Sequence, residues 1–251
     1  MNPNSYLTEV FLNDGLPILF IDFDGTISEK DVIDRILDQF ADERWLEIEA
    51  QWTSGEIGSR ECLREQFALV KAAPAELDEF LDTLELDEGF PTLLRICEEA
   101  EIDVHIVSDG FDYYIRRMLE KSVSNRQLPN RFSIAANRLI PHGRNNWHTE
   151  FPYFETVCGD GCATCKPAVM QMKNPFAAPS IFIGDGFSDR FAAKSADIVF
   201  AKKKLSEFCL ENRIPQTAYS GLKQVAENLD EAFENFVLTL KGERRSRLKA
   251  A

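Results

Sequence analysis

Four short apolar runs alternate with helical patterns along most of the chain. They lie in the segments PILFIDFDGT from Pro17, EIDVHIVSDG from Glu101, PSIFIGDGFSD from Pro179 and ADIVFA from Ala196. Continuous runs rich in Ile, Val and Phe are typical of strands that are covered on both faces, as in parallel sheets. Because helical patterns separate the runs, the sequence predicts an α/β fold with a doubly wound, mostly parallel sheet.

Residues 29–89 interrupt this alternation. They carry helical patterns such as DVIDRILDQF and SRECLREQFALVKA without a strand between them. We therefore expect a small helical unit over the carboxyl edge of the sheet, with residues 1–28 and 90–251 forming the α/β core. An irregular region, roughly residues 139–165, is compatible with a short hairpin, and the segment after Gly221 predicts an amphipathic helix with a basic end.

Composition narrows the classes of partner. The chain has 251 residues and a net charge of −14, which disfavours nucleic acid and anionic membranes as partners. The same charge repels a phosphorylated ligand unless the site supplies local positive charge. No apolar run approaches the roughly 20 residues of a membrane span, and the first residues lack the pattern of a signal peptide. The expectation is a cytoplasmic protein with reduced thiols and a small-molecule partner. The oligomeric state is left open.

Acidic or small polar residues follow the three strongest strands. These residues are Asp22 and Asp24, then Ser108, Asp109 and Gly110, then Asp185 and Asp189. A single ending of this kind is usually a turn. Three of them on neighbouring strands, together with Lys166, point instead to a site, because ligands of α/β sheets bind at the carboxyl ends of strands.

The paired aspartates indicate a metal ion. Asp22 and Asp24 are two residues apart on extended chain, so their side chains project to the same side. Carboxylates packed together repel each other unless a cation holds them. With Asp185 and Asp189 they form a hard-oxygen set that suits Mg²⁺.

The other residues suit a phosphoryl group. Lys166 and Mg²⁺ would neutralise its charge, which answers the objection raised by the acidic surface. The hydroxyl of Ser108 and backbone N–H groups up to Gly110 could hold the remaining phosphoryl oxygens.

The segments DFDGT, SDG and GDGFSD, with Lys166 between the last two, resemble the four motifs of the haloacid-dehalogenase-like phosphatases. The resemblance covers about residues 16–201, and it implies a role for each motif residue. Asp22 would be the nucleophile that forms an aspartyl-phosphate, and Asp24 the general acid and base. Ser108, Asp109, Gly110 and Lys166 would bind the phosphate. Mg²⁺ would lie on Asp22, the backbone carbonyl of Asp24, and Asp185, with Asp189 in support.

Asp24 favours a phosphatase, since the dehalogenases of this superfamily do without the second aspartate. The helical segment resembles the cap of the phosphoserine-phosphatase-like subgroup. CATCKPAVM and GDGFSDRFAAKSADIVFA look most like the branch that acts on 2-hydroxy-3-keto-5-methylthiopentenyl-1-phosphate.

Phosphoserine phosphatase is the nearest alternative. Enzymes of that kind carry a carboxylate-binding Arg in the cap, whereas ECLREQFALV offers Arg64 and has Gln66 where that Arg is expected. Asp31 stands where phosphoserine phosphatases carry an acidic residue that contacts the substrate. A phosphotransferase or mutase of the same superfamily, and a catalytically silent binding or regulatory protein, are the further alternatives. A catalytically silent protein would show degenerate motifs, and none of the four motifs is degenerate here.

A second metal site is a weaker hypothesis. Cys158, Cys162 and Cys165 could bind Zn²⁺ with His142 or His148 as a fourth ligand, against the simpler interpretation of three reduced thiols. His105 is interpreted as a core residue. Trp45 and Trp52 are interpreted as packing residues of the helical segment, and Lys202–Lys204 as solvated surface.

Overall fold

The computed structural model describes residues 3–122, 132–156 and 161–250. Its sheet has seven strands in the order β4-β3-β2-β1-β5-β6-β7. The strands are β1 (Ile18–Ile21), β2 (Val104–Phe111), β3 (Phe132–His142), β4 (Asn146–Glu150), β5 (Ser180–Gly184), β6 (Ile198–Ala201) and β7 (Thr217–Ala218). All neighbouring pairs are parallel except β3 and β4. The predicted α/β class with a mostly parallel sheet is therefore confirmed.

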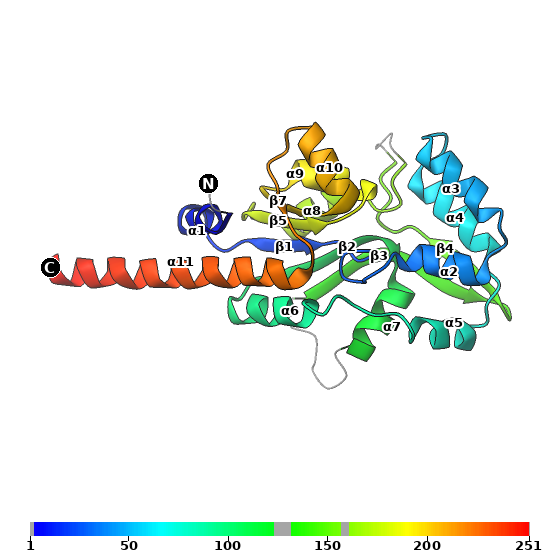
Figure 1. Cartoon of the computed structure of the whole chain (residues 1–251), viewed down its shortest axis with the longest axis horizontal. Coiled ribbons are helices and arrows are strands. Elements are labelled where there is room, and N and C mark those ends of the chain that lie inside the picture. The colour runs from blue at the N-terminus through cyan, green and yellow to red at the C-terminus, as the bar shows by residue number, and fades with distance from the viewer. Residues whose placement is uncertain (1–2, 123–131, 157–160, 251) are drawn as a thin grey trace.

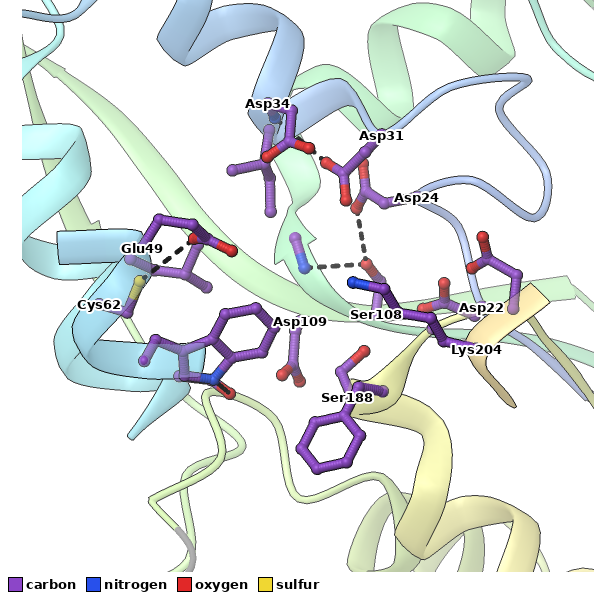
Figure 2. Close-up of a pocket in the computed structure, with 18 of the residues that line it drawn as sticks. Asp22, Asp24, Asp31, Asp34, Glu49, Cys62, Ser108, Asp109, Ser188 and Lys204 are labelled. Atoms are coloured by element: carbon purple, nitrogen blue, oxygen red, sulfur yellow. Dashed lines mark hydrogen bonds between the residues drawn. The ribbon is translucent and has the colours of Figure 1, made fainter. Parts of the chain in front are cut away.

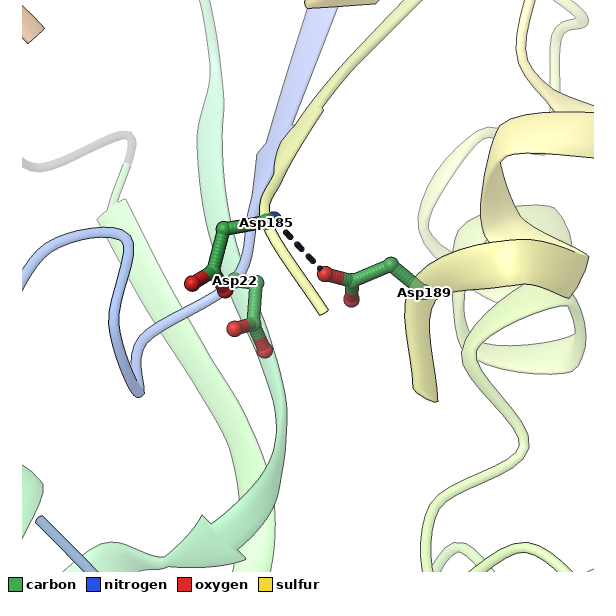
Figure 3. A group of neighbouring side chains, drawn as sticks. All are labelled: Asp22, Asp185 and Asp189. Atoms are coloured by element: carbon green, nitrogen blue, oxygen red, sulfur yellow. Dashed lines mark hydrogen bonds between the residues drawn. The ribbon is translucent and has the colours of Figure 1, made fainter. Parts of the chain in front are cut away.

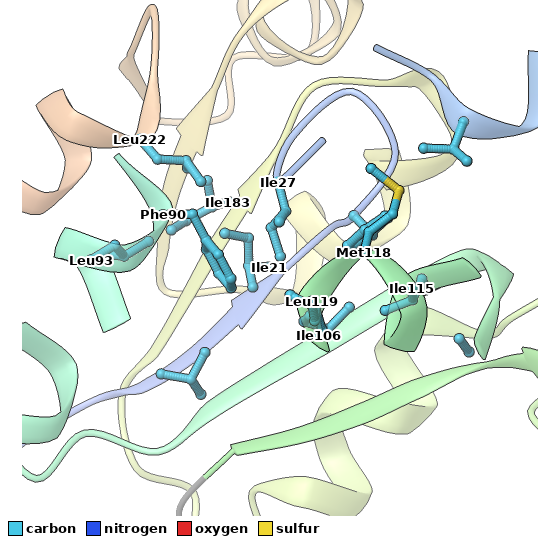
Figure 4. Close-up of a cluster of buried hydrophobic side chains, with 14 of the residues drawn as sticks. Ile21, Ile27, Phe90, Leu93, Ile106, Ile115, Met118, Leu119, Ile183 and Leu222 are labelled. Atoms are coloured by element: carbon cyan, nitrogen blue, oxygen red, sulfur yellow. The ribbon is translucent and has the colours of Figure 1, made fainter. Parts of the chain in front are cut away.

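Two hydrophobic cores cover the sheet, and β1 contributes to both. Leu19 and Ile21 belong to the core that also contains α1 (Pro3–Asp14), α6 (Phe90–Glu99), α7 (Asp112–Ser122) and α11 (Leu222–Ala250). Figure 4 shows part of it, where Ile21 and Ile183 meet Phe90. Phe20 belongs to the other core, with α8 (Lys166–Lys173), α9 (Arg190–Ser195) and α10 (Lys203–Glu211). This alternation along β1 follows from the two-residue period of a strand.

Four helices come between β1 and α6 and form the helical insert, as we name residues 29–89. They are α2 (Val32–Phe40), α3 (Trp45–Thr53), α4 (Ser59–Leu69) and α5 (Pro74–Leu81). In Figure 1 they lie beyond the carboxyl ends of the parallel strands. The hairpin β3–β4 reaches the insert: the Trp147 indole donates to the carbonyl of Ala72 (3.0 Å), and Lys71 Nζ donates to Asn146 Oδ1 (2.7 Å).

The predicted strands and the C-terminal helix are present, whereas several other elements were not anticipated. The hairpin lies within the irregular region, but its first strand begins earlier, at Phe132. The unanticipated elements include α1, α8, α10 and the two-residue strand β7. None of the helices in the described part of the chain combines the length and the apolarity needed to cross a membrane.

Candidate active site

The site lies where the strand order reverses. β1 pairs with β2 on one side and with β5 on the other, and the chain then proceeds outward in both directions. Such a switch point leaves a crevice at the carboxyl ends of the two central strands. Asp22 is the first residue after β1, and its backbone N–H donates to the carbonyl of Ile183 in β5 (2.9 Å). The nucleophile position predicted from the sequence is thus held by both strands.

Three buried carboxylates converge in this crevice (Figure 3). Asp22, Asp185 and Asp189 each offer an oxygen, and these oxygens lie within 4.8 Å of one another. Asp185 follows β5, and Asp189 belongs to the short 3-10 helix η1 (Phe187–Asp189). Within the described residues this is the one group of three or more such side chains that could share an ion. Carboxylate oxygens at this spacing fit Mg²⁺, which the sequence predicted here.

The oxygens of Asp189 are already engaged by the protein. Its Oδ2 accepts hydrogen bonds from the backbone N–H groups of Asp185 (3.0 Å) and Gly186 (3.1 Å), and its Oδ1 accepts from Lys166 Nζ (2.5 Å). Asp189 therefore orients Asp185 and Lys166. The other two carboxylates accept hydrogen bonds from side chains, Asp22 from Lys166 and Asp185 from Thr26 and Lys203.

Lys166 is the buried cation of the site. Only 2% of its side chain is exposed, and Nζ also donates to Asp22 Oδ1 (2.6 Å). Burial alone would lower the pKa of Lys166, but the carboxylates of Asp189 and Asp22 raise it well above its ordinary value. Burial, and then the charge of Asp189, raise the pKa of Asp22. The charge of Lys166 opposes that rise in the pKa of Asp22 without cancelling it.

Asp24 is held by donors from three elements. Its Oδ2 accepts from the hydroxyl of Tyr114 (2.6 Å) and from Ser108 Oγ (3.3 Å), and its Oδ1 accepts from the N–H of Val32 (3.2 Å). Burial raises the pKa of Asp24 to about 6, although these hydrogen bonds lower it. A carboxyl group with a pKa near 6 is suited to exchanging protons near neutral pH. Sequence reasoning missed Tyr114, whose only signal was its place one helical turn after SDG.

The turn that carries Asp24 is built around Asp185. Gly25 has a φ of +73°, and a β-carbon there would lie 2.5 Å from Asp185 Oδ2, so glycine is required on both counts. The hydroxyl of Thr26 donates to Asp185 Oδ1 (3.3 Å). The hydroxyl of Ser28 accepts from the N–H of Gly25 (3.0 Å) and closes the turn.

The Ser108–Gly110 segment is packed tightly against these groups. A β-carbon on Gly110 would collide with the hydroxyl of Tyr114 and the carboxylate of Asp24. The N–H of Gly110 donates to Ser108 Oγ (2.9 Å). Thr164, also missed from the sequence, donates from its N–H to Asp109 Oδ1 (3.0 Å). Burial raises the pKa of Asp109 to about 6.

A cavity of about 340 Å³ joins this site to the insert (Figure 2). Its lining combines residues from the core with residues from α2, α3 and α4. The core residues include Asp22, Asp24, Ser108, Asp109, Gly110, Asp185 and Ser188, and the insert residues are Asp31, Ile33, Asp34, Glu49, Trp52, Ser59, Cys62, Leu63 and Gln66. A cavity of this size suits a small metabolite.

Two interpretations are incomplete. Lys203 and Lys204 are exposed, as expected, but they also line the cavity, and Lys203 Nζ is 2.9 Å from Asp185 Oδ2. Trp45 is buried in the core, as expected, but Trp52 belongs to the cavity wall and donates from its indole to Ser59 Oγ (3.0 Å). In both cases the tertiary structure places at the cavity residues whose local sequence indicated only surface or packing.

Of the other residues singled out in the sequence, one lines the cavity and two lie outside it. Gln66 lines the cavity, whereas Arg64 is exposed and pairs with Glu61 (3.4 Å). His105 lies in β2, half-buried and hydrogen-bonded to Ser133 Oγ (2.7 Å), outside the cavity.

The zinc hypothesis gains no support. Cys158 lies outside the described residues. Cys162 and Cys165 belong to no group of three or more metal-ligating side chains in the part of the chain that the structure describes.

Comparisons with known proteins agree with this geometry. The family model of haloacid dehalogenase-like hydrolases matches residues 19–194. A Bacillus pumilus (strain SAFR-032) protein is 30% identical over 224 residues, covering 87% of this chain and 93% of its own length. A Geobacillus thermodenitrificans (strain NG80-2) protein is 29% identical over 215 residues, covering 84% and 94%. Both are named 2-hydroxy-3-keto-5-methylthiopentenyl-1-phosphate phosphatase.

Solved structures share the fold at lower identity. A phospho-aspartyl intermediate analogue of phosphoserine phosphatase has a TM-score of 0.63 at 18% identity, covering 84% of this chain and 98% of that chain. A HAD family hydrolase from Salmonella enterica serovar Typhi has a TM-score of 0.64 at 19% identity, covering 88% and 78%. Cytosolic 5′-nucleotidase IIIB bound to cytidine has a TM-score of 0.59 at 14% identity, covering 95% and 91%. These likenesses concern the fold alone.

Proposed function

The chain belongs to the haloacid dehalogenase-like hydrolase family, and we propose that it is a Mg²⁺-dependent phosphatase of a small phosphorylated metabolite. One observation carries the proposal: Asp22, which is paired with the buried Lys166 ammonium, and Asp24 line one cavity together with residues of the insert. Such an arrangement supplies a nucleophile, a cation for the phosphoryl oxygens and a proton donor for the leaving oxygen.

The first step is attack of an Asp22 carboxylate oxygen on phosphorus. The bond from phosphorus to the alcohol oxygen breaks, and Asp24 gives that oxygen its proton. Lys166 and the hydroxyl of Ser108 hold the phosphoryl oxygens. In the second step Asp24 takes a proton from water, whose oxygen attacks phosphorus and breaks the bond to Asp22. Phosphate leaves, and both carboxyl groups return to their starting states.

The metal would be held by the carboxylates of Asp22 and Asp185 and by the backbone carbonyl of Asp24, with Asp189 in support. When bound, Mg²⁺ supplies positive charge that neutralises the phosphoryl oxygens and the nucleophile as they approach each other. The fit of the donors supports this assignment, since buried carboxylates so close together need a counter-charge.

For the substrate we propose 2-hydroxy-3-keto-5-methylthiopentenyl-1-phosphate. Two relatives carry the name of a phosphatase for this compound, and the match with this chain extends over more than nine-tenths of each of them. Their names support the choice. Phosphoserine is the competing substrate. The neutral Gln66 in the cavity wall, in place of an arginine, speaks against it.

The mechanism is tested by Asp22→Asn. With Mg²⁺ and an aryl phosphate as substrate, the variant should lose activity by about a thousandfold or more, because an amide cannot form the acyl phosphate. Asp38→Asn, an exposed change in α2, is the matched control and should retain activity. Retained turnover in Asp22→Asn would refute the nucleophile assignment. The same assay on 2-hydroxy-3-keto-5-methylthiopentenyl-1-phosphate and on phosphoserine tests the substrate, and equal activity on both would refute that choice alone.

A further inference from the structure

The insert wall of the cavity, all of it within the described residues, carries carboxylates and no cation. Glu49, Asp31 and Asp34 line it on the insert side, and no Arg or Lys from the described insert does so. The arginines of the insert have other partners. Arg35 pairs with Asp38 (3.8 Å), Arg44 with Asp42 (2.7 Å) and Arg64 with Glu61 (3.4 Å), while Arg60 stacks on Phe154. The wall that faces the leaving alcohol therefore has negative charge without a cation of its own.

Glu49 is the carboxylate that α3 contributes to this wall. Its Oε2 accepts a hydrogen bond from Nε2 of the buried Gln66 (3.0 Å), and the thiol of Cys62 donates to it over 3.8 Å. It forms no ion pair within the described part of the chain. A neutral amide and a thiol thus fix the position of the carboxylate without cancelling its charge. Figure 2 shows Glu49 and Cys62 at the end of the cavity opposite Asp22 and Ser188.

The cations that line the cavity are supplied by the core. Lys203 and Lys204 come from the start of α10, and Lys203 is paired with Asp185. Lys204 extends from the same side toward the middle of the cavity (Figure 2). Within the described residues, the lysines that line the cavity thus come from the core side, beside the motif carboxylates, and none of them comes from the insert wall that carries Glu49.

Apolar surface completes the alcohol end. Trp52, Leu63 and Ile33 line the same wall as Glu49. A leaving group that fills this end would contact an indole and two aliphatic side chains. An alkyl or thioalkyl chain gains from that contact, because it leaves water for an apolar surface.

We infer that Glu49 makes this cavity select phosphomonoesters whose alcohol carries no carboxylate, and that it accepts a hydrogen bond from a hydroxyl group of the alcohol. The inference rests on the phosphatase function proposed above. A substrate carboxylate would meet the like charge of Glu49 with no cation beside it, which disfavours binding. A hydroxyl group can donate to the same carboxylate oxygen.

Two substrates that differ only at the relevant group test this selection. Glycerol 1-phosphate and 3-phosphoglycerate share a skeleton, and the hydroxymethyl group of the first is a carboxylate in the second. With Mg²⁺, kcat/KM for glycerol 1-phosphate should exceed that for 3-phosphoglycerate by at least about tenfold. In Glu49→Gln the ratio should shrink several-fold, and in Glu49→Lys it should invert. Glu47→Gln makes the same charge change on α3 away from the cavity and should keep the wild-type ratio.

The outcomes separate the inference from the function beneath it. If the wild type hydrolyses an aryl phosphate but treats the two substrates alike, or if Glu49→Gln keeps the full ratio, the inference is refuted while the phosphatase stands. A wild-type preference for 3-phosphoglycerate would also refute it and would point to Lys204 as the partner of the carboxylate. No hydrolysis of any phosphate would refute the proposed function and the inference with it. Should Glu49→Lys fail to fold, Glu49→Gln decides.

Discussion

At the scale of single residues, burial gives the site groups their properties. Lys166 is almost fully enclosed, with a carboxylate on either side of its ammonium group. Charges that would cost several kcal/mol alone are tolerated in this set because each compensates another. Removing one member therefore leaves the others uncompensated, and its effect on folding is larger than that of a surface ion pair.

Lys166→Met should lower the free energy of unfolding by about 3–5 kcal/mol at neutral pH. Without the lysine, the pKa of Asp22 rises further, and the folded state then binds a proton that the unfolded state releases. The loss should therefore narrow as the pH falls toward the ordinary carboxyl pKa of about 4. Denaturant titrations at several pH values measure it. Lys173→Met, at the other end of α8, is the control, and an equal loss in both variants at every pH would contradict the prediction.

Tyr114→Phe should change the pH dependence of turnover. The Tyr114 hydroxyl lowers the pKa of Asp24, so its removal raises that pKa above about 6. Asp24 must be protonated to serve the leaving oxygen, and kcat/KM should fall with rising pH at a higher pH than in the wild type. The maximal rate should drop about tenfold, since Asp24 loses a positioning hydrogen bond.

Tyr113→Phe provides the comparison for this change. The Tyr113 hydroxyl donates to Asp78 (2.9 Å) and does not touch Asp24. An unchanged pH profile in Tyr114→Phe, or an equal shift in Tyr113→Phe, would show that the Tyr114 hydrogen bond does not tune Asp24.

At the scale of elements, one contact joins the last helix to the end of the insert. The backbone N–H of Leu222, at the start of α11, donates to the carboxylate of Asp87 (3.2 Å). The N–H of Gly89 donates to the same carboxylate (2.9 Å). A carboxylate at a helix N-terminus satisfies a free N–H and complements the helix dipole. Asp87 therefore caps a helix that begins 135 residues further along the chain.

Asp87→Ala should lower the free energy of unfolding by about 1 kcal/mol, the usual cost of losing a cap. The denaturant midpoint measures this cost. Glu227→Ala, an exposed change within α11, should leave the midpoint almost unchanged. If the two variants lose the same stability, Asp87 does not cap the helix.

Elements with strong local patterns were predictable, and short or context-dependent ones were not. The runs around Phe20 and Phe182 predicted strands because both faces of each are buried. The two residues of β7 pair with β6 only through tertiary contact, and their sequence carries no strand pattern. Lys203 shows the same limit at the start of α10: its φ of +48° and its ion pair with Asp185 depend on where the sheet places them.

At the scale of the whole molecule, the carboxylate cluster links metal binding to stability. If Mg²⁺ binds only the folded state, a concentration one hundred times the dissociation constant adds about 2.7 kcal/mol. For a chain of this size that stabilisation corresponds to a rise in Tm of about 5–10 °C. Thermal unfolding with Mg²⁺ and with EDTA measures the difference, and KCl at matched ionic strength is the control.

Asp185→Asn should abolish most of this rise, because it removes one of the carboxylates that can face the ion. An equal rise with KCl, or a full rise in Asp185→Asn, would mean that Mg²⁺ acts on the overall charge of −14 rather than at the cluster.

The sequence by itself determined the α/β class, the order of the main elements and the family. These properties depend on local patterns: apolar runs of strand length, and short motifs such as DFDGT and GDGFSD at the ends of those runs. Asp22, Asp24 and Asp185 could be proposed as site residues because the carboxyl ends of parallel strands meet at one edge of a sheet.

Only the tertiary structure decided what surrounds those residues. Tyr114 meets Asp24, Lys203 meets Asp185 and Glu49 faces the alcohol end of the cavity, each from a helix with its own local pattern. Such contacts join residues that are far apart in the chain, so no local period or spacing signals them. For the same reason the one-sided placement of the cavity lysines, which come from the core while Glu49 comes from the insert, became visible only when the insert and the core were seen together.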